Sequence, residues 1–287
     1  MLSAAEALHV ERRRRPRPSL RQQYDEYILQ RIESYKNSVP RDELVSLAQV
    51  AATELHSATE GQFVLTELLM LESVDQLIRR RLKLKPFKRW KEYVRSLRDA
   101  QREPTHWGLE PACPVAGLLR RIEPDDQAVV IGPCGEAAAC LLAAHDMGIT
   151  FLAGDMASVD RIESRFEQEA LTAAFSAYVV DFATWLPPLP DQVSVAVLDV
   201  TALGELAPVV RADLVMEVQA RTSPRGVHVL MGRLGGLAPE SLLSLYDGWI
   251  REEPGRPRRG RARARGIVVG PPAAPAARRP ANGLAVG

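Results

Sequence analysis

Cysteine is scarce in this sequence, with three residues in 287: Cys113, Cys134 and Cys140. So small and odd a number, in no metal-ligand spacing, argues against a disulfide framework and a cysteine-held metal and favours free thiols. Long apolar runs are also missing, since none approaches the roughly 18 residues of a membrane helix. The opening stretch, MLSAAEALHVERRRR, holds two glutamates and no continuous apolar core. We therefore expect a cytoplasmic protein with no metal, no membrane contact and no secretory signal or transit peptide.

Charge nearly cancels over the whole chain, at a formal +1, but it is unevenly spread. Residues 251–287 hold nine arginines and two acids, which leaves 28 bases and 34 acids for the rest. This last segment is rich in Arg, Pro, Ala and Gly, so we expect a mostly disordered tail with GIVVG (266–270) as its candidate strand. Residues 1–19 are predicted to be a mobile leader.

The first third of the chain has the apolar period of helices. Leu20, Tyr24, Ile28 and Ile32 recur every fourth residue and would share one helix face. Further helices are predicted from Pro40, over 60–84 and after Pro86. The sequence therefore predicts an all-α N-terminal domain over residues 20–101.

Basic residues gather at the end of this helical domain, with ten bases and one acid between Arg79 and Arg98. Lys88, Arg89, Lys91 and Arg95 lie mostly off the apolar face of the predicted fourth helix. Such a surface can follow a phosphate backbone, so RNA or DNA is a candidate partner. A solvated helix face is the alternative interpretation.

After residue 102 the pattern changes to short apolar, β-branched runs: QAVVIG, GITFLAGD, AYVVDF, VSVAVLDV and GVHVLMG. Helix-like segments lie between most of them, over 136–146, 158–173 and 206–221, and a last amphipathic helix is expected over 238–253. Alternating strands and helices predict a doubly wound, mainly parallel α/β sheet over 102–250. Ligands in such sheets bind at the carboxyl ends of the strands, at the switch point.

Chemistry-bearing residues follow the predicted strands at that edge. Gly132 and Gly135 follow the first strand and allow close approach to backbone N–H groups. Asp155 ends the second strand, 23 residues after Gly132, near the usual place of a ribose-binding acid. After the third strand, Asp181 can accept from an exocyclic amino group and Phe182 can pack on a purine. Helix caps and tight turns without a ligand are the alternatives.

Over about Thr105 to Trp249 the chain resembles the class I S-adenosylmethionine (SAM)-dependent methyltransferases. VVIGPCGEAAACLLAA, FLAGDMASVDRIE, VVDFATWLPP, VSVAVLDVTALGEL and SPRGVHVLMG are similar to its successive motifs. The resemblance implies SAM as cofactor and a sheet that ends in two antiparallel strands. The cofactor-binding residues it implies are Gly132, Cys134, Gly135, Asp155, Asp181 and Phe182, with Trp107 as a lid. The alternative for Trp107 is a core residue that anchors the linker.

Methyl transfer is an in-line displacement that depends mainly on positioning, with a base where the acceptor loses a proton. His106 and Asp199 are weak candidates for that base, and His228, inside a predicted strand, is expected to be a core residue. Neither Cys134 nor Cys140 is expected to be a nucleophile. A small molecule is the expected methyl acceptor, with nucleic acid (RNA) as the alternative.

The chain also departs from the family pattern. Cys134 and Glu136 stand where glycines are common, and Val130 stands where an acid is common. The Cys134 and Glu136 side chains of the loop are expected to crowd the cofactor, and Glu136 to place a negative charge near the cofactor's carboxylate. Since GIVVG is the one candidate for the two final strands, we expect an exposed fifth strand and a homodimer formed through it.

Three other functions stay open. A degenerate, non-catalytic scaffold would explain the departures at the glycine turn. A nucleic-acid binding module would use the basic helix within 79–98. A dinucleotide-dependent oxidoreductase would need a glycine at Cys134 and gives no role to Asp181 and Phe182.

Overall fold

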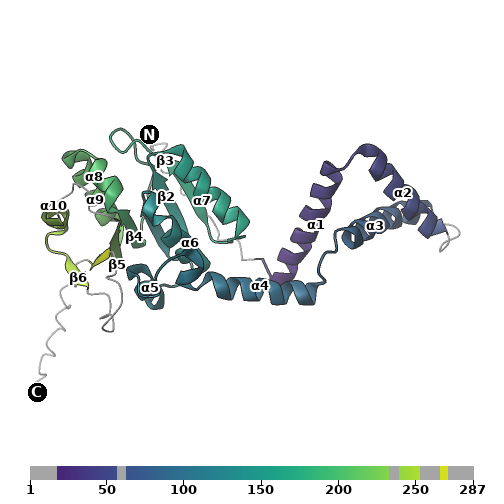
Figure 1. Ribbon diagram of the computed structural model, residues 1–287, viewed down its shortest axis with the longest axis horizontal. Helices are drawn as coiled ribbons and strands as arrows, with labels where there is room; N and C mark the ends of the chain where they lie inside the picture. Colours follow the sequence, from purple (N-terminus) through teal and green to yellow (C-terminus); the bar gives the residue numbers. More distant parts are fainter. Residues whose placement is uncertain (1–17, 57–62, 233–238, 253–265, 271–287) are drawn as a thin grey trace, which may run out of the picture. The chain divides into compact units, whose positions relative to one another are not determined.

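Two units follow one another along the chain, residues 1–97 and 98–287, in the computed structural model (Figure 1). The structure describes residues 18–56, 63–232, 239–252 and 266–270. Most of the expected leader and tail therefore lies outside the described residues. The two units divide between Leu97 and Arg98, inside helix α4 (Phe87–Gln101), and the boundary expected after residue 101 stays a prediction. No helix among the described residues is long and apolar enough to cross a membrane.

The first unit is helical, as predicted. It contains α1 (Leu20–Ser38), α2 (Arg41–His56), α3 (Phe63–Arg81) and the start of α4. Ser19 caps α1 by accepting from the Gln22 backbone N–H, and the Gln22 side chain accepts in return from the Ser19 N–H. Ile28 and Ile32 of α1 are fully buried together with Ile78 of α3, and Tyr24 packs against them, so three of the four predicted stripe residues lie in the contact face.

The second unit holds a seven-stranded sheet in the order β3-β2-β1-β4-β5-β7-β6. Its strands are β1 (Gln127–Ile131), β2 (Gly148–Ala153), β3 (Phe175–Val179), β4 (Val193–Asp199), β5 (Thr222–Met231), β6 (Ile250–Glu252) and β7 (Gly266–Gly270). The first five are parallel, whereas β7 runs antiparallel to both β5 and β6. The strand order reverses between β1 and β4, which is the switch point of a doubly wound sheet.

Helices cover both faces of this sheet (Figure 1). One face packs on α5 (Pro114–Leu118), α6 (Glu136–Ala144) and α7 (Met156–Gln168). The other packs on α8 (Val200–Glu205), α9 (Pro208–Arg221) and α10 (Pro239–Leu243). The continuous burial of β1, β2 and β4 follows from this two-sided cover and explains why their sequences do not alternate.

The end of the sheet corrects two expectations. The helix predicted over 238–253 ends at Leu243 and is followed by a 3-10 turn over Ser244–Tyr246. The chain then turns at Gly248, with φ +80°, and Ile250–Glu252 forms β6. GIVVG is β7 and pairs with β5 along His228 to Met231. The fifth strand is therefore covered on that side, and the reason for expecting a dimer through it is gone.

Candidate functional site

A pocket of about 350 Å³ lies at the switch point, where the carboxyl ends of β1 and β4 meet. Its lining comes from the turns after β1, β2, β3 and β4: Gly132, Pro133, Cys134, Gly154, Asp155, Phe182, Asp199, Thr201, Ala202, Glu205 and Leu206. Five of the sequence-predicted site residues, Gly132, Cys134, Asp155, Phe182 and Asp199, are thus brought together. Among these lining residues there are three acids and no Lys or Arg.

Gly132 is required by the geometry of the turn after β1. Its φ of +89° lies in a region that L-residues with side chains rarely adopt. A Cβ at this position would stand 2.4 Å from the Asp199 Cβ and 3.0 Å from the Ala202 Cβ. The glycine therefore lets the β1 turn and the β4 turn approach each other. At Gly135 the neighbour is Val130, whose Cγ1 lies 2.4 Å from where a Cβ would be.

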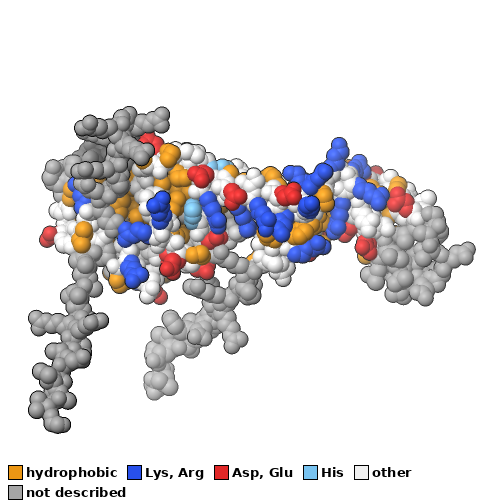
Figure 2. Space-filling model, turned by 90° about the horizontal axis from the view of Figure 1, so that it is seen from below, with side chains coloured by type: hydrophobic (Ala, Val, Ile, Leu, Met, Phe, Trp, Pro, Cys, Tyr) orange, Lys and Arg blue, Asp and Glu red, His pale blue; other side chains and the backbone are white. Residues whose placement is uncertain are grey.

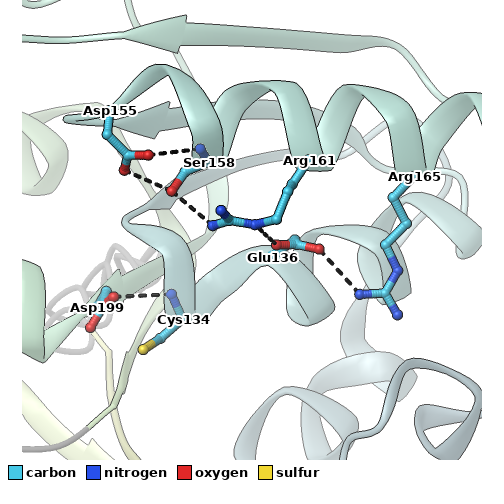
Figure 3. Close-up of polar contacts among 7 residues, drawn as sticks. All are labelled: Cys134, Glu136, Asp155, Ser158, Arg161, Arg165 and Asp199. Carbon is cyan, nitrogen blue, oxygen red and sulfur yellow. Dashed lines mark hydrogen bonds and ion pairs between the residues drawn. The ribbon is translucent and has the colours of Figure 1, made fainter.

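Asp199 joins the two turns through its carboxylate (Figure 3). Its Oδ2 accepts from the Cys134 backbone N–H at 3.0 Å, and its Oδ1 accepts from the N–H groups of Thr201 at 2.8 Å and Ala202 at 3.4 Å. The residue is 1% exposed although it lines the pocket. Asp199 is therefore the N-cap of α8 and also holds the glycine turn in place. Because its carboxylate is buried and accepts these three hydrogen bonds, the geometry does not support Asp199 as the base.

Asp155 caps α7 at the neighbouring strand end (Figure 3). Its Oδ1 accepts from the Ser158 N–H at 2.8 Å and its Oδ2 from the Ser158 hydroxyl at 2.7 Å. These hydrogen bonds lower the pKa of the Asp155 carboxyl from its ordinary value, so the group is charged at neutral pH. Asp155 can cap α7 and also contact a ligand in the pocket, because each carboxylate oxygen keeps a second lone pair that can accept a hydrogen bond.

Glu136 does not crowd the pocket. It opens α6 and lies between two arginines of α7, with Arg161 Nε 3.5 Å from Oε2 and Arg165 Nη1 3.2 Å from Oε1 (Figure 3). Neither it nor Val130, which is fully buried, belongs to the lining. The expected repulsion of a cofactor carboxylate by Glu136 is thus wrong: the charge is paired and belongs to the contact between α6 and α7.

Asp181 and Phe182 follow β3, which ends at Val179, two residues before Asp181. Phe182 is half-buried, packs against the α8 and α9 side of the core and lines the pocket. The exposed Asp181 accepts from the Ala183 N–H at 3.1 Å and is not among the lining residues. The apolar half of the predicted adenine pair is therefore in the pocket, and the acidic half stabilises the adjacent turn.

His106 and Trp107 lie away from the pocket, contrary to expectation. Trp107 is 3% exposed in the core, where its Nε1 donates to the Gln101 carbonyl at 2.6 Å and the Arg165 guanidinium lies 5.2 Å from its ring centroid. His106 Nε2 is 3.1 Å from Glu169 Oε2, just beyond the carboxyl end of α7. Because α7 runs against the strands, this is the opposite edge of the sheet. Trp107 anchors the start of the unit, and His106 is not placed to act as a base.

Other chemistry-bearing side chains are in the core. His228 is fully buried, as expected. Burial raises the pKa of the Cys140 thiol to about 12, so this thiol stays protonated and inert, whereas Cys134 is exposed at the pocket. Among the described residues, no group of three His, Cys, Asp or Glu could hold a metal ion.

Sequence reasoning missed the contribution of α8. Thr201, Ala202, Glu205 and Leu206 all line the pocket. The segment DVTALGELAP gave a signal, since Asp199 followed by Thr201 is a common helix start and Pro208 a helix-opening residue. Glu205 is exposed, lines the pocket and makes no polar contact with another described residue.

No protein-family model and no curated protein matches this chain. Among solved structures, a TehB-like SAM-dependent methyltransferase from Corynebacterium glutamicum matches 63% of this chain and 95% of its own, at 15% identity and a TM-score of 0.42. The N-methyltransferase NodS from Bradyrhizobium japonicum matches 55% and 92%, at 12% identity and 0.42. A SAM-dependent methyltransferase from Geobacter sulfurreducens, in complex with S-adenosyl-L-homocysteine, matches 40% and 45%, at 16% identity and 0.32.

The sheet type follows from the topology of this chain itself. The five parallel strands are added to one side of β1 and then, from β4 on, to the other side. β7 lies between β5 and β6 and is antiparallel to both. This is the arrangement that the sequence resemblance implies, including the two antiparallel strands. The second unit is therefore a doubly wound α/β domain of the class I methyltransferase type, preceded by a helical N-terminal region.

Proposed function

We propose that the pocket at the switch point binds SAM and that the chain transfers its methyl group to a small molecule. The observation that carries the proposal is the charge of the pocket, which is lined by Asp155, Asp199 and Glu205 and by no Lys or Arg. SAM presents a sulfonium and an ammonium, both cationic, and two ribose hydroxyls that can donate to a carboxylate. An acidic pocket with Phe182 as an apolar wall suits such a ligand.

The same features argue against a dinucleotide cofactor. A pyrophosphate needs backbone N–H groups or cations at the glycine turn. Here the Cys134 N–H is donated to Asp199, and the nearest charged groups in the lining are negative. The pocket therefore favours a cation over a bridging phosphate.

The chain's own contribution to the reaction is positioning. When bound, SAM supplies an electrophilic methyl group on its sulfonium. Asp155 would hold the ribose, Phe182 would pack on the adenine, and Glu205 would face the sulfonium. Neither candidate base is suitably placed, so the acceptor must arrive as a competent nucleophile or lose its proton to Glu205.

Calorimetric titration with SAM, S-adenosylhomocysteine and NAD tests the proposal. We expect micromolar binding of the first two and none of NAD. Glu205→Gln should weaken SAM about fivefold and S-adenosylhomocysteine less, because only SAM carries the sulfonium charge. Binding of NAD alone would contradict the proposal.

Asp155→Asn separates the ribose contact from helix capping. Asparagine is as good an N-cap as aspartate, so the free energy of unfolding should be nearly unchanged. Loss of the charged acceptor should weaken SAM and S-adenosylhomocysteine equally, by about tenfold. Ser158→Ala is the matched control: it removes a capping partner and keeps the carboxylate. If only Ser158→Ala weakened binding, Asp155 would be a cap alone.

A non-catalytic scaffold is the second candidate, and one contact favours it. The Asp199 carboxylate takes the Cys134 N–H, a donor that a bound ligand would otherwise use at the glycine turn. On this alternative, none of the three ligands binds. The helical unit would then be the place to look for a partner.

A further inference from the structure

The connection between α3 and α4 carries a second pocket, of about 350 Å³. Five of its lining residues are cationic, namely Arg79, Arg80, Lys83, Lys85 and Arg89, and none is acidic. All five are exposed. Five like charges around one hollow repel one another, so the surface is suited to a polyanion that neutralises several of them together.

Some bases elsewhere in this unit are paired with acids. Lys36 Nζ lies 3.0 Å from both Glu33 Oε1 and Asp75 Oδ1, and Arg81 pairs with Glu43. By contrast, none of the five pocket cations forms an ion pair with a described carboxylate. The positive charge therefore continues without neutralisation onto α4, where Lys88 and Arg95 are exposed and Lys91 half-buried.

Figure 2 shows this surface as a run of Lys and Arg side chains along the stretch that holds α4 in Figure 1. We define the basic surface as the five pocket cations with Lys88, Lys91 and Arg95. Of the four residues that the sequence singled out on α4, one belongs to the pocket, and the others extend it along the helix.

An exposed aromatic ring adjoins the pocket. Tyr93 is 51% exposed, one helical turn after Arg89, and Lys85 Nζ lies 4.1 Å from its ring centroid. The ring therefore lies beside one cation of the pocket, and about half of it is open to solvent. A phosphate bound in the pocket would place the attached nucleoside within reach of the free face of this ring.

The pocket is held in place from inside the unit. Tyr24 of α1 donates its hydroxyl to the Lys85 carbonyl at 3.1 Å, and its ring contacts Phe87 and Trp90 at centroid distances of 5.3 Å. Trp90 is 8% exposed, so the apolar face of α4 is turned inward. The surface is thus preformed and cationic, and the aromatic side chains behind it pack inside the unit, where they cannot insert into a lipid bilayer.

We propose that this basic surface binds single-stranded nucleic acid, with phosphates in the α3–α4 pocket and a base stacked on Tyr93. Cationic tracks with stacking rings bind single strands with little sequence preference. The inference does not depend on SAM binding, because every residue that carries it lies in the first unit. RNA and single-stranded DNA share this chemistry, and the experiment distinguishes them.

The test titrates the full chain into fluorescently labelled oligo(U) and oligo(dT) of about twelve nucleotides each and follows the anisotropy of the label. Arg80→Ala, Lys83→Ala and Arg89→Ala together should weaken binding at least tenfold and reduce the slope of log affinity against log salt by about 2. The matched control replaces three tail arginines, Arg256, Arg258 and Arg259, with alanine, removing the same charge. An equal loss in both triple variants would overturn the proposal, since binding would then follow net charge.

Tyr93 gives the second readout. Tyr93→Ala should weaken binding of both oligomers about fivefold or more, and Tyr93→Phe should retain it. Because the ring is exposed, neither change should lower the thermal unfolding midpoint. Tighter binding of a duplex of equal length, or of phosphatidylserine vesicles, than of either oligomer would overturn the assignment. An affinity for oligo(U) at least tenfold above oligo(dT) would identify RNA as the partner.

Discussion

Replacing Gly132 with alanine is expected to lower the free energy of unfolding of the α/β unit by about 3 to 4 kcal/mol. Two effects add. The φ of +89° is strained for any residue with a Cβ, and the new methyl would lie 2.4 Å from the Asp199 Cβ. The β1 and β4 turns would have to separate, which would also break the 3.0 Å bond between the Cys134 N–H and Asp199. Ligand binding at the pocket should fail with it.

Gly108→Ala is the matched control for this experiment. Gly108 also has a positive φ, +77°, and lies in the same unit, but its ψ of 15° is left-handed helical, whereas the ψ of Gly132 is 158°. A methyl group added at Gly108 would have nothing within 4 Å. The change should cost about 1 to 2 kcal/mol, the strain alone. Urea unfolding followed by tryptophan fluorescence measures both variants. Equal losses would mean that the contact with Asp199 relaxes freely and that the two turns are not braced against each other.

Lowering the pH is expected to destabilise the same unit through His228. The side chain is fully buried between Thr222 and Tyr246, and burial lowers its pKa to about 3. The Thr222 hydroxyl donates to the Val218 carbonyl at 2.6 Å, so its oxygen accepts from His228 Nε2 at 2.8 Å. Nδ1 then accepts from the Tyr246 hydroxyl at 3.0 Å, and protonation there would break this bond.

The direction of the pH effect follows from these two states. The unfolded chain binds the proton near pH 6.5, and the folded chain does not until about pH 3. The free energy of unfolding is therefore not reduced by His228 above pH 6.5. Between pH 6.5 and about pH 3 it falls by about 1.4 kcal/mol for each pH unit, which amounts to about 2 kcal/mol at pH 5. Carboxyl groups with lowered pKa, such as Asp155, act at lower pH and leave this window to His228.

His228→Gln isolates the titration. Glutamine retains a donor and an acceptor but takes up no proton in this range. Its unfolding free energy at pH 8 gives the packing loss, and its change between pH 8 and 5 should be about 2 kcal/mol smaller than in the parent. An unchanged slope in the variant would assign the pH dependence to other groups. Urea unfolding at four pH values decides the matter.

The elements of the fold followed largely from local pattern. Pro40 and Pro86 opened helices where expected, and the buried parallel strands were visible as apolar runs without alternation. The sequence-based prediction was wrong where the structure of a segment depends on pairing with a distant strand. Ile250–Glu252 reads as the end of an amphipathic helix, yet it pairs with β7, which lies fourteen residues further along the chain. Pairing over such a distance leaves no local signal.

The candidate site shows the same division. Glycine at 132 and acids after successive strands were sufficient to predict a ligand edge, because parallel strands bring their carboxyl ends together. Partners of the charged groups were not predictable. By its place in the loop Glu136 was expected to face the pocket, but it pairs with Arg161 and Arg165 of α7 and is not part of the pocket lining. His106 and Trp107 precede the sheet in sequence and lie at its other edge, beside Gln101 and Glu169.

By itself, the sequence determined the helical unit, the α/β class, the switch-point edge and the positions of Gly132, Asp155 and Asp199. These depend on hydrophobic period, turn chemistry and strand direction, all of which act locally along the chain. The tertiary structure alone decided that Asp199 braces the glycine turn, that Glu205 enters the pocket and that five cations surround the α3–α4 turn without described carboxylate partners. A side chain's charge acts through space, so its role is set by whichever groups the fold brings within a few ångströms.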